Sequence, residues 1–593
     1  MNRFKTNNSL FFPWLPFLAF FIGSFIYFGF FVDYILFYQE KSSLFIFSAD
    51  FLFENLHQPG SLLIYLGKFF STFFYYPLAG ALIVSAIITL IVLTISKIIG
   101  FLTGGNAKFV PFIIGVALFY LQTDYRFLLF NNLGLLLQLA LFCLVIRYLN
   151  FLKGWIVVLI TPLWYFATGG FALIFSLLLT FWFAFNKEKK GWIKIVVLWC
   201  LNFLTFYISK EFLFFQTGKT LLIFPFSELN TGSQPVLFIS VAGILSILPV
   251  IARIKFSLPF KLKVHDFAAG LITATLISIF LVTIGIKQSD KKTRKYFHVE
   301  KLFYQNKFDE VIAYNTANPS TNLLTIFLNN IALCEKDKLN DLLFHFPQSP
   351  DGKTLFLKWE MVGEILKRGG YFYYTIGMIN DAHRWAFENM VMNGHSPEGL
   401  KMLIRTDLIN GNYEVASKYI AILKNTLFYK EEAKAFEKLL FNDAAINADR
   451  ELGEKRKNRL KTDFFSITDN HDPYINIERI LTNDSLNKKA FEYKLAFMLL
   501  KKNYKGIANE LHKFESFGFT RLPVHIEEAV VALSLLNKGK IPYTANIQIN
   551  KNTELRFEQF LTVFQHFGTD PKSAEPALRK QFGSTFWYYV FYR

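Results

Sequence analysis

Cysteine is scarce in this sequence. Cys143, Cys200 and Cys334 are the only three among 593 residues. Two of them lie in long apolar runs, and the third stands alone in the second half of the chain. Three isolated cysteines exclude a disulfide framework and a cysteine-based zinc site. They do not indicate whether the protein lies in an oxidising or a reducing compartment.

Several motifs of catalysis and binding are also missing. The histidines include no His-Glu-x-x-His pattern, so a zinc metalloprotease is not expected. Gly218-Lys219-Thr220 resembles the end of a P-loop, but Leu213 stands where the first glycine of that motif belongs. The net charge is +18, yet basic residues do not cluster with stacking aromatics, so nucleic acid is not an expected partner.

Charge is sparse in the first half of the chain, and this half holds nearly all the long apolar runs. Hydrophobic residues make up 53% of the whole sequence, which excludes a single soluble domain. The second half has an ordinary charged composition. The sequence therefore predicts an all-α protein with a transmembrane helical domain at 1–288, which includes an outer loop at 33–76. A helical domain follows at 289–593, with a possible break near 455–472.

Nine apolar segments qualify as membrane spans, each of which needs about 20 residues. The first is too long and too aromatic for a signal-peptide core, and no small-residue cleavage site follows it. Losing either the third or the fifth span would invert the topology of everything downstream. The nine expected spans are Phe11–Val32, Leu78–Gly100, Lys108–Gln122, Phe127–Ile146, Phe151–Thr168, Gly170–Phe185, Trp192–Ser209, Pro235–Ile251 and Asp266–Ile286.

The distribution of basic residues gives the orientation, because cytoplasmic connectors carry an excess of lysine and arginine. With a cytoplasmic N-terminus, fourteen basic residues lie in inner connectors: Arg3, Lys5, Lys97, Lys108, Arg147, Lys153, Lys187, Lys189, Lys190, Lys194, Arg253, Lys255, Lys261 and Lys263. Five lie in outer connectors: Lys41, Lys68, Arg126, Lys210 and Lys219. This asymmetry places the C-terminal domain outside. The basic run at 287–295 falls on the external side in this topology and so opposes the rule. A large folded domain follows it, and such domains translocate largely regardless of charge.

The C-terminal domain shows short amphipathic helices joined by turns. Pro319 and Pro350 end helix pairs 31 residues apart, close to the 34 residues of a tetratricopeptide repeat. An aromatic residue follows the turn between paired helices at Phe308, Tyr413 and Tyr504. The full repeat consensus is absent. We therefore expect a tetratricopeptide-like array, whose stacked helix pairs suit the binding of peptides or partner proteins.

The outer connectors carry the candidate functional residues. An acid follows the first span directly, a very short connector holds an acid and a base, and a longer connector adds two lysines. These residues are Asp33, Glu40, Glu54, His57, Asp124, Arg126, Lys210 and Lys219. They are interpreted either as solvated residues of interfacial loops or as a membrane-surface active site.

The layout of the first half resembles the GT-C-type glycosyltransferases, integral enzymes that take sugars from polyprenyl-phosphate carriers. The resemblance rests on the cytoplasmic N-terminus, the acid Asp33 just after the first span, a first outer loop with a short helix at 61–75, and an external C-terminal domain. Some members of that class carry tetratricopeptide repeats there. The usual paired acids are absent, because Tyr34 follows Asp33.

The resemblance implies a role for each candidate residue. It makes Asp33 the catalytic base for the acceptor proton, with Asp124 or Glu54 assisting or holding a divalent ion such as magnesium. Positive charge would meet the departing phosphate. The substrate-binding residues would then be Arg126, Lys210, Lys219, Glu40 and His57. The partners would be the bilayer and a polyprenyl-phosphate sugar, with the repeats presenting the acceptor.

A second hypothesis is a non-catalytic membrane anchor whose repeats scaffold an envelope protein complex. The two-part plan also resembles an uncharacterised family of bacterial polytopic proteins with a tetratricopeptide-like C-terminal region. That resemblance implies the cytoplasmic (inner) membrane of a bacterium and no particular activity. Transport has little support, because the spans carry few ionisable residues.

Overall fold

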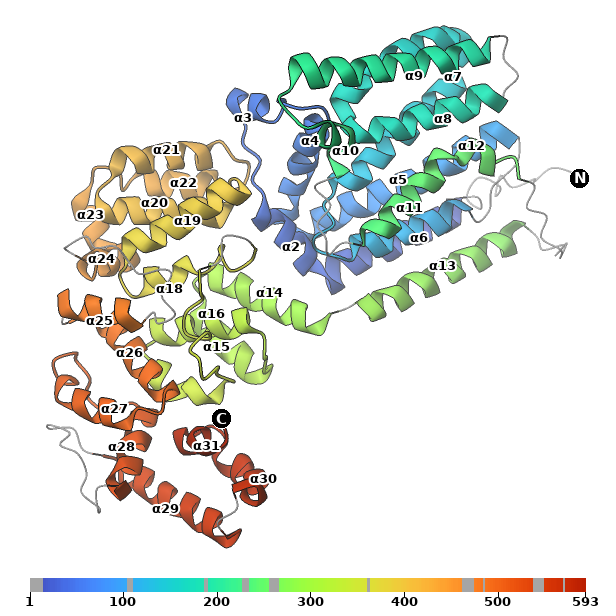
Figure 1. Ribbon diagram of the computed structural model, residues 1–593. Coiled ribbons are helices and arrows are strands. Elements are labelled where there is room, and N and C mark those ends of the chain that lie inside the picture. Colours follow the sequence, from blue (N-terminus) through green and yellow to red (C-terminus); the bar gives the residue numbers. More distant parts are fainter. Residues whose placement is uncertain are drawn as a thin grey trace, which may run out of the picture. The chain divides into compact units, whose positions relative to one another are not determined.

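The computed structural model describes residues 14–103, 110–185, 190–226, 234–254, 266–288, 290–359, 363–460, 474–483, 486–536, 549–568 and 571–593. Within these ranges every regular element is a helix (Figure 1). The chain forms two compact units. Unit 1 comprises residues 1–290 with Asn425–Phe428, and unit 2 comprises Lys291–Lys424 with Tyr429–Arg593. Arg3, Lys5, Lys108 and most of the predicted break at 455–472 lie outside the described residues.

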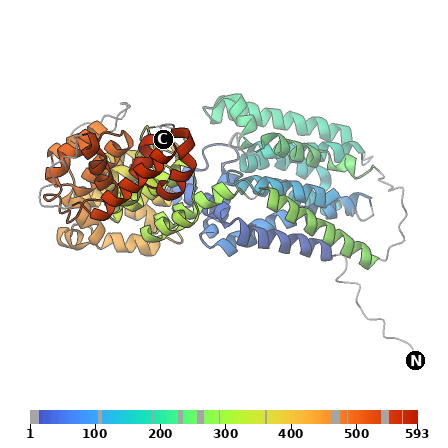
Figure 2. The same cartoon turned by 90° about the horizontal axis from the view of Figure 1, so that it is seen from below.

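Unit 1 is a bundle whose helices lie side by side with similar axis directions (Figures 1 and 2). Its elements are α1 (Leu15–Ile26), η2 (Tyr27–Phe31), α2 (Asp33–Ser42), α3 (Ala49–Glu54), α4 (Ser61–Thr72), η3 (Phe73–Tyr75), α5 (Pro77–Thr103), α6 (Val110–Gln122), α7 (Phe130–Thr168), η4 (Gly169–Phe171), α8 (Ala172–Phe185), α9 (Gly191–Ile208), η5 (Ser209–Leu213), α10 (Gly218–Ile223), α11 (Pro235–Ser246), α12 (Leu248–Ile251) and α13 (Asp266–Gln288).

Several of these helices are long and apolar enough to cross a membrane, which indicates a membrane protein. By length and composition, five segments of the described chain qualify: Pro77–Thr103, Phe130–Tyr148, Gly154–Phe185, Gly191–Leu213 and Leu271–Gln288. A sixth qualifies if Leu15–Phe31 and Asp33–Ser42, which meet at a 72° bend, form one span. Val110–Gln122 and Pro235–Ser246 are apolar but shorter.

The 39-residue helix α7 folds back on itself. In a straight helix, Gln138 and Trp164 would lie about 39 Å apart, because each residue adds 1.5 Å. Instead the indole Nε1–H of Trp164 donates to Oε1 of Gln138 at 2.6 Å. A second reversal follows, since a Cβ placed on Gly154 would lie 3.4 Å from the ring of Phe183. The segment Phe130–Phe185 is therefore three antiparallel arms, with turns near 147–154 and at Gly169–Gly170.

Contacts between pairs of helices give the directions of the others. The ring centroids of Phe20 and Phe112 lie 6.4 Å apart, and those of Tyr27 and Phe119 lie 5.0 Å apart, so α1 and α6 are parallel. The Tyr27 hydroxyl also donates to the carbonyl oxygen of Gly285 at 3.4 Å, which places the end of α13 beside the end of α1.

The two ends of this bundle differ in the connectors that they carry. The end that holds residues 33–76, 123–129, 169–171 and 209–226 is called the connector end. At the other end, Arg253 lies over the ring of Phe185 at 5.1 Å and Lys194 lies over that of Phe183 at 5.3 Å. We call this the basic end.

Glycines join three connectors tightly at the connector end. The N–H of Gly60 donates to the carbonyl of Phe166 at 3.0 Å, and the N–H of Gly170 donates to that of Phe224 at 2.7 Å. Gly169 adopts φ 58°. A Cβ on Gly169 would lie 2.4 Å from the Phe224 oxygen and 3.0 Å from Cα of Gly60. This approach requires glycine, because only glycine has neither the Cβ nor the strain at positive φ.

Unit 2 consists of short helices, many of them in antiparallel neighbours such as α19, α20 and α21 (Figure 1). Its elements are α14 (Lys291–Tyr304), α15 (Phe308–Ala317), α16 (Leu323–Glu335), α17 (Leu339–Leu342), η7 (Leu343–His345), α18 (Gly370–Thr375), α19 (Ile379–Asn393), α20 (Pro397–Asn410), α21 (Tyr413–Lys424), α22 (Lys430–Glu437), α23 (Asp443–Ala448), α24 (Arg450–Lys457), α25 (Tyr474–Asn483), α26 (Lys488–Leu500), α27 (Tyr504–Glu510), η8 (Leu511–Lys513), α28 (Val524–Leu536), α29 (Lys551–His566), α30 (Pro571–Phe582) and α31 (Phe586–Tyr592).

One turn geometry recurs between helices of unit 2. A residue at positive φ follows the first helix at Asn306, Asp337, Gly377, Gly411 and Lys502. The next residue then donates its N–H to the carbonyl five residues earlier, at 2.8–3.0 Å, in Lys307, Lys338, Met378, Asn412 and Asn503. This is the Schellman motif, which satisfies the last carbonyls of a helix and reverses the chain. Unit 2 thus repeats a helix–turn–helix element.

The C-terminal helix α31 is held at both ends by charged side chains. The buried carboxylate of Glu528 accepts from the N–H of Phe586 at 2.7 Å and from Nδ1 of His525 at 2.8 Å. At the other end, Nζ of Lys502 donates to the carbonyl of Val590 at 2.9 Å. A negative charge at a helix N-terminus and a positive charge at its C-terminus both complement the helix dipole.

Candidate functional site

Asp33 is the first residue of α2 and lies directly after the 72° bend. Its side chain is half-buried, and within the described part of the chain it forms no hydrogen bond or ion pair. The bend explains the location, because π-helix η2 ends at Phe31 and Val32 leaves the helical region at φ −136°. The chain thus starts a new helix at the acid that was expected to follow the first span.

Asp124 is bound by the base two residues later. Its Oδ1 accepts from the backbone N–H and from Nε of Arg126, at 3.0 and 3.1 Å, and its Oδ2 accepts from Nη2 at 3.1 Å. The hydrogen bond with Asp124 raises the pKa of Arg126 above its usual value. This bidentate pair fixes the short connector after α6. The structure therefore brings these two predicted residues together, as partners of each other.

Buried amides connect this turn to α2. Nε2 of Gln39 donates to the carbonyl of Phe127 at 2.9 Å, and Nε2 of Gln122 donates to the same oxygen at 3.1 Å. Nδ2 of Asn132 donates to Oε1 of Gln122 at 2.8 Å. Among the described residues, the side-chain oxygens of Gln39 and Asn132 have no donor. The α2 helix is thereby anchored to the connector that carries Asp124.

Asp33 sits on a different part of α2 from this anchor. It precedes Gln39 by six residues, which is about 9 Å along the axis and about 120° around it. Glu40, seven residues after Asp33, shares its face of the helix and is buried. The Glu40 carboxylate pairs with Lys41 at 3.6 Å. That Asp33 and Asp124 line one cavity stays a prediction.

Glu54 and His57 lie at the end of α3, where both side chains are exposed. Nδ1 of His57 contacts the carbonyl oxygen of Glu54, a local bond that closes the turn after the helix. Lys210 and Lys219 are exposed as well. Lys210 lies in η5, where its ammonium pairs with Glu211 at 2.5 Å.

The carboxylates do not fit a magnesium site. Magnesium needs several oxygen ligands in near-octahedral geometry. Both oxygens of Asp124 are bound to Arg126, and in the described ranges no three acidic, histidine or cysteine side chains group as metal ligands. Among the described residues, Asp33 offers a half-buried carboxylate without a hydrogen-bond or ion-pair partner, which can accept a proton.

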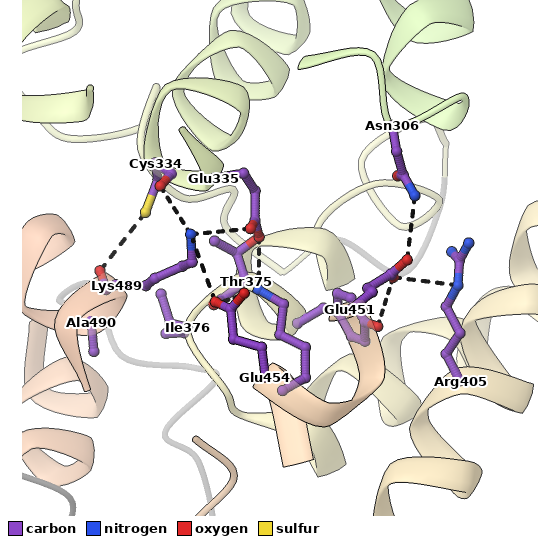
Figure 3. Close-up of polar contacts among 12 residues, drawn as sticks. Asn306, Cys334, Glu335, Thr375, Ile376, Arg405, Glu451, Glu454, Lys489 and Ala490 are labelled. Atoms are coloured by element: carbon purple, nitrogen blue, oxygen red, sulfur yellow. Dashed lines mark hydrogen bonds and ion pairs between the residues drawn. The ribbon is translucent and has the colours of Figure 1, made fainter. Parts of the chain in front are cut away.

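Unit 2 contains a buried ion-pair cluster that the sequence did not reveal (Figure 3). Glu335 at the end of α16 accepts from Nζ of Lys455 at 2.7 Å and of Lys489 at 3.2 Å. Lys455 also donates to the carbonyl of Thr375, and Lys489 to that of Cys334, each at 3.2 Å. Burial raises the pKa of Glu335, but the two ammonium groups more than offset it, so the pKa lies below its usual value.

The neighbouring carboxylate of Glu451 joins three more elements (Figure 3). It accepts from the Tyr374 hydroxyl at 2.8 Å and from Nδ2 of Asn306 at 3.3 Å, and it pairs with Nε of Arg405 at 3.4 Å. These two clusters connect α16, α18, α20, α24 and α26 with the turn between α14 and α15. Since their donors and acceptors pair with one another, we interpret them as cross-links between helix pairs.

Glu492 on α26 differs from these acids. It is 2% exposed, and neither of its carboxylate oxygens has a hydrogen-bond partner in the described chain. Burial, followed by the charge of Asp337, raises the pKa of Glu492 to about 8. One signal was available in the sequence: Lys489, Glu492 and Lys494 recur inside a strongly apolar helix, so some of these charges had to be buried.

Comparison with protein families gives one match, a family of unknown function (DUF6057), whose model covers residues 9–593. The chain belongs to this family. The DUF6057 match spans both units, so the family is defined by the membrane helices and the helical unit 2 together. No curated protein and no solved structure matches the chain.

Proposed function

We propose that this DUF6057 protein is a membrane-anchored scaffold. Unit 1 crosses the bilayer nine times, and unit 2 is a tetratricopeptide-like domain that binds a partner protein of the cell envelope. The observation that carries this proposal is the recurring Schellman turn, which gives unit 2 the build of a helical repeat protein. Such arrays present extended surfaces to peptides and proteins.

The directions of the helices support nine crossings. The three arms of Phe130–Phe185 count as three spans, because each reverses the one before it. The short helix α6 runs parallel to α1 between the two ends of the bundle. With α5, α9, the α11–α12 pair and α13, the count is nine, and successive spans alternate in direction.

The location of basic residues supports a cytoplasmic N-terminus. Lys194 and Arg253 contact aromatic rings at the basic end, and the inner connectors of the nine-span topology carry fourteen basic residues against five. Cytoplasmic connectors are enriched in such residues. Unit 2 then lies on the external side of a bacterial cytoplasmic membrane.

A second candidate function is transfer of a sugar from a polyprenyl phosphate. One observation favours it: the half-buried Asp33 carboxylate is unpaired and follows a sharp bend at the end of the first span. A general base must lie within hydrogen-bond reach of the proton that it removes, and a carboxylate without a partner can accept that proton. Against it, Asp124 is bound to Arg126, and Lys210 is bound to Glu211.

Asp33→Asn separates the two functions. A strain that lacks the gene is complemented with wild type, Asp33→Asn, or Asp50→Asn, which changes an exposed acid of the same connector. If the protein is a scaffold, mass spectrometry of surface glycans should find no difference between the deletion strain and the three complemented strains. A glycan that is lost in the deletion and in Asp33→Asn, but kept in Asp50→Asn at equal membrane abundance, would establish the transferase and refute the scaffold.

A further inference from the structure

The connector end of unit 1 exposes large apolar side chains on and near α3 and η5. On α3 and the turn after it, Phe53 is 69% exposed and Leu56 is 43% exposed. On η5, Phe212 is 74% exposed, and Phe215 just beyond η5 is fully exposed. Exposed apolar groups that gather on one part of a protein mark an interaction surface.

The residues of α3 fall into three sectors around its axis. At 3.6 residues per turn, Ala49 and Phe53 lie about 40° apart, and the exposed Leu56 follows in the turn after the helix; these residues are called the Phe53–Leu56 sector. Asp50 and Glu54, both exposed, lie about 100° around the axis from Ala49 and Phe53. Phe51 faces the protein and is buried. An apolar sector beside a strongly polar one is found in helices that lie in the plane of a membrane interface.

The exposed apolar side chains near α3 and those near η5 belong to one part of the bundle. Phe166, near the end of the second arm of α7, accepts a hydrogen bond from Gly60, which follows α3 by six residues. The ring of Phe166 also lies 6.3 Å from that of Phe214, which follows η5 directly. Both connectors therefore meet at the same arm.

The apolar surface of α9 continues into this region. In the candidate span Gly191–Leu213, Leu204, Ile208 and Phe212 follow one another at four-residue spacing and are 51%, 38% and 74% exposed, so this exposed face of the span continues into η5. The Lys210–Glu211 pair lies in η5, where charged groups suit the headgroup level. A surface continuous with a lipid-facing span has lipid as its nearest neighbour.

We propose that α3 is an interfacial element whose Phe53–Leu56 sector inserts into the headgroup and acyl boundary of the bilayer. Asp50 and Glu54 then face water. Two different connectors then contact the membrane, the first through α3 and the one after α9 through η5. They flank the contacts of Gly60, Gly169 and Gly170, which we call the glycine junction. This inference rests on the membrane spans alone and holds whether the protein is a scaffold or a transferase.

Spin labels measure how deeply α3 inserts into the bilayer in the full-length protein. Cys143 and Cys200 are replaced by alanine, while Cys334 is buried and stays. Single labels are placed by Phe53→Cys, Glu54→Cys and Phe215→Cys in nanodiscs of phosphatidylethanolamine and phosphatidylglycerol. Power saturation then compares collision with oxygen, which concentrates in lipid, against a water-soluble nickel chelate.

The proposal predicts that the labels at positions 53 and 215 collide several-fold more with oxygen than with the nickel chelate, and that position 54 shows the reverse. The neighbouring position 54 controls for the label itself, because both sites lie on the same six-residue helix. Nickel access at 53 equal to that at 54 would place the sector in water and overturn the proposal. An immobile label at 53 that neither reagent reaches would place it against protein, such as a second copy, and would also overturn it.

Discussion

Glu492 is a residue of α26, near the turn that leads from α16 into α17. The charged groups that face it are Asp337 and Asp341 from that turn and helix, and Lys488 and Lys489 from α26. A buried carboxyl without hydrogen-bond partners favours its neutral form, because ionisation is costly away from water. At neutral pH the folded protein therefore keeps this group protonated.

This predicts a specific pH dependence for Glu492→Gln. The pKa of Glu492 in the folded protein, about 8, is above the ordinary glutamate value of 4.5. The folded state then binds the extra proton between these values, and stability is lost as pH rises from about 5 to 8. Thermal unfolding of the full-length protein in detergent should show little effect of Glu492→Gln at pH 5. At pH 8.5 the variant should be more stable than wild type, by on the order of a few kcal/mol.

Glu431→Gln is the matched control, since Glu431 is fully exposed and pairs with Lys434 at 2.7 Å across one helical turn. Glu431→Gln should change the stability by the same small amount at both pH values. An equal offset for Glu492→Gln at pH 5 and 8.5 would contradict the account of a neutral buried acid.

Side-chain partners of this kind were hard to derive from the sequence. The proximity of Asp124 and Arg126 was predictable, because a two-residue spacing in a short connector leaves little freedom. The cluster of Glu335, Lys455 and Lys489 was not, because its members are up to 154 residues apart along the chain (335 to 489). Only tertiary packing brings them together.

At the scale of elements, the glycine junction holds three connectors in one place. Gly169 is the critical residue, because a Cβ there would meet the carbonyl oxygen of Phe224 at 2.4 Å and the φ of 58° disfavours other residues. The clash is with backbone, which cannot move as a flexible side chain would. These connectors meet where α4 begins and where α10 ends.

Gly169→Ala should therefore destabilise unit 1 by roughly 2–4 kcal/mol, through overpacking and backbone strain. Gly243→Ala in α11 is the control, because a Cβ there meets nothing within 4 Å. Thermal stability in detergent, followed by size-exclusion chromatography, should fall for Gly169→Ala and stay at the wild-type value for Gly243→Ala. Equal stability of the two variants would show that the junction tolerates a side chain and would refute its role.

Helices were easier to derive from the sequence than breaks within them. The reversal at Gly169–Gly170 was predictable, since a glycine pair interrupts an apolar run. The end of the first span at Val32 was expected from the acid Asp33, but the 72° bend between two helices was not, because neither glycine nor proline stands at that position. It arises where a π-helical turn leaves the helix, a local geometry that composition does not specify.

For the whole molecule, the nine-crossing topology makes a direct prediction. Alkaline phosphatase, which is active only outside the cytoplasm, is fused after Lys194 and after Asp290. The fusion at 194 should be inactive and that at 290 active, because three spans, an odd number, separate them. The same activity at both positions would mean that the span count is wrong by one.

The scaffold itself is tested most directly by cross-linking in native membranes. A lysine-reactive reagent is applied to cells that carry the full-length protein, and cross-linked peptides are identified by mass spectrometry. Exposed lysines of unit 2, such as Lys418 and Lys438, report on its neighbours. The account predicts cross-links from unit 2 to one other envelope protein in near-stoichiometric amount, unchanged in Asp33→Asn. Cross-links confined to the protein itself, together with a glycan defect in Asp33→Asn, would contradict the scaffold.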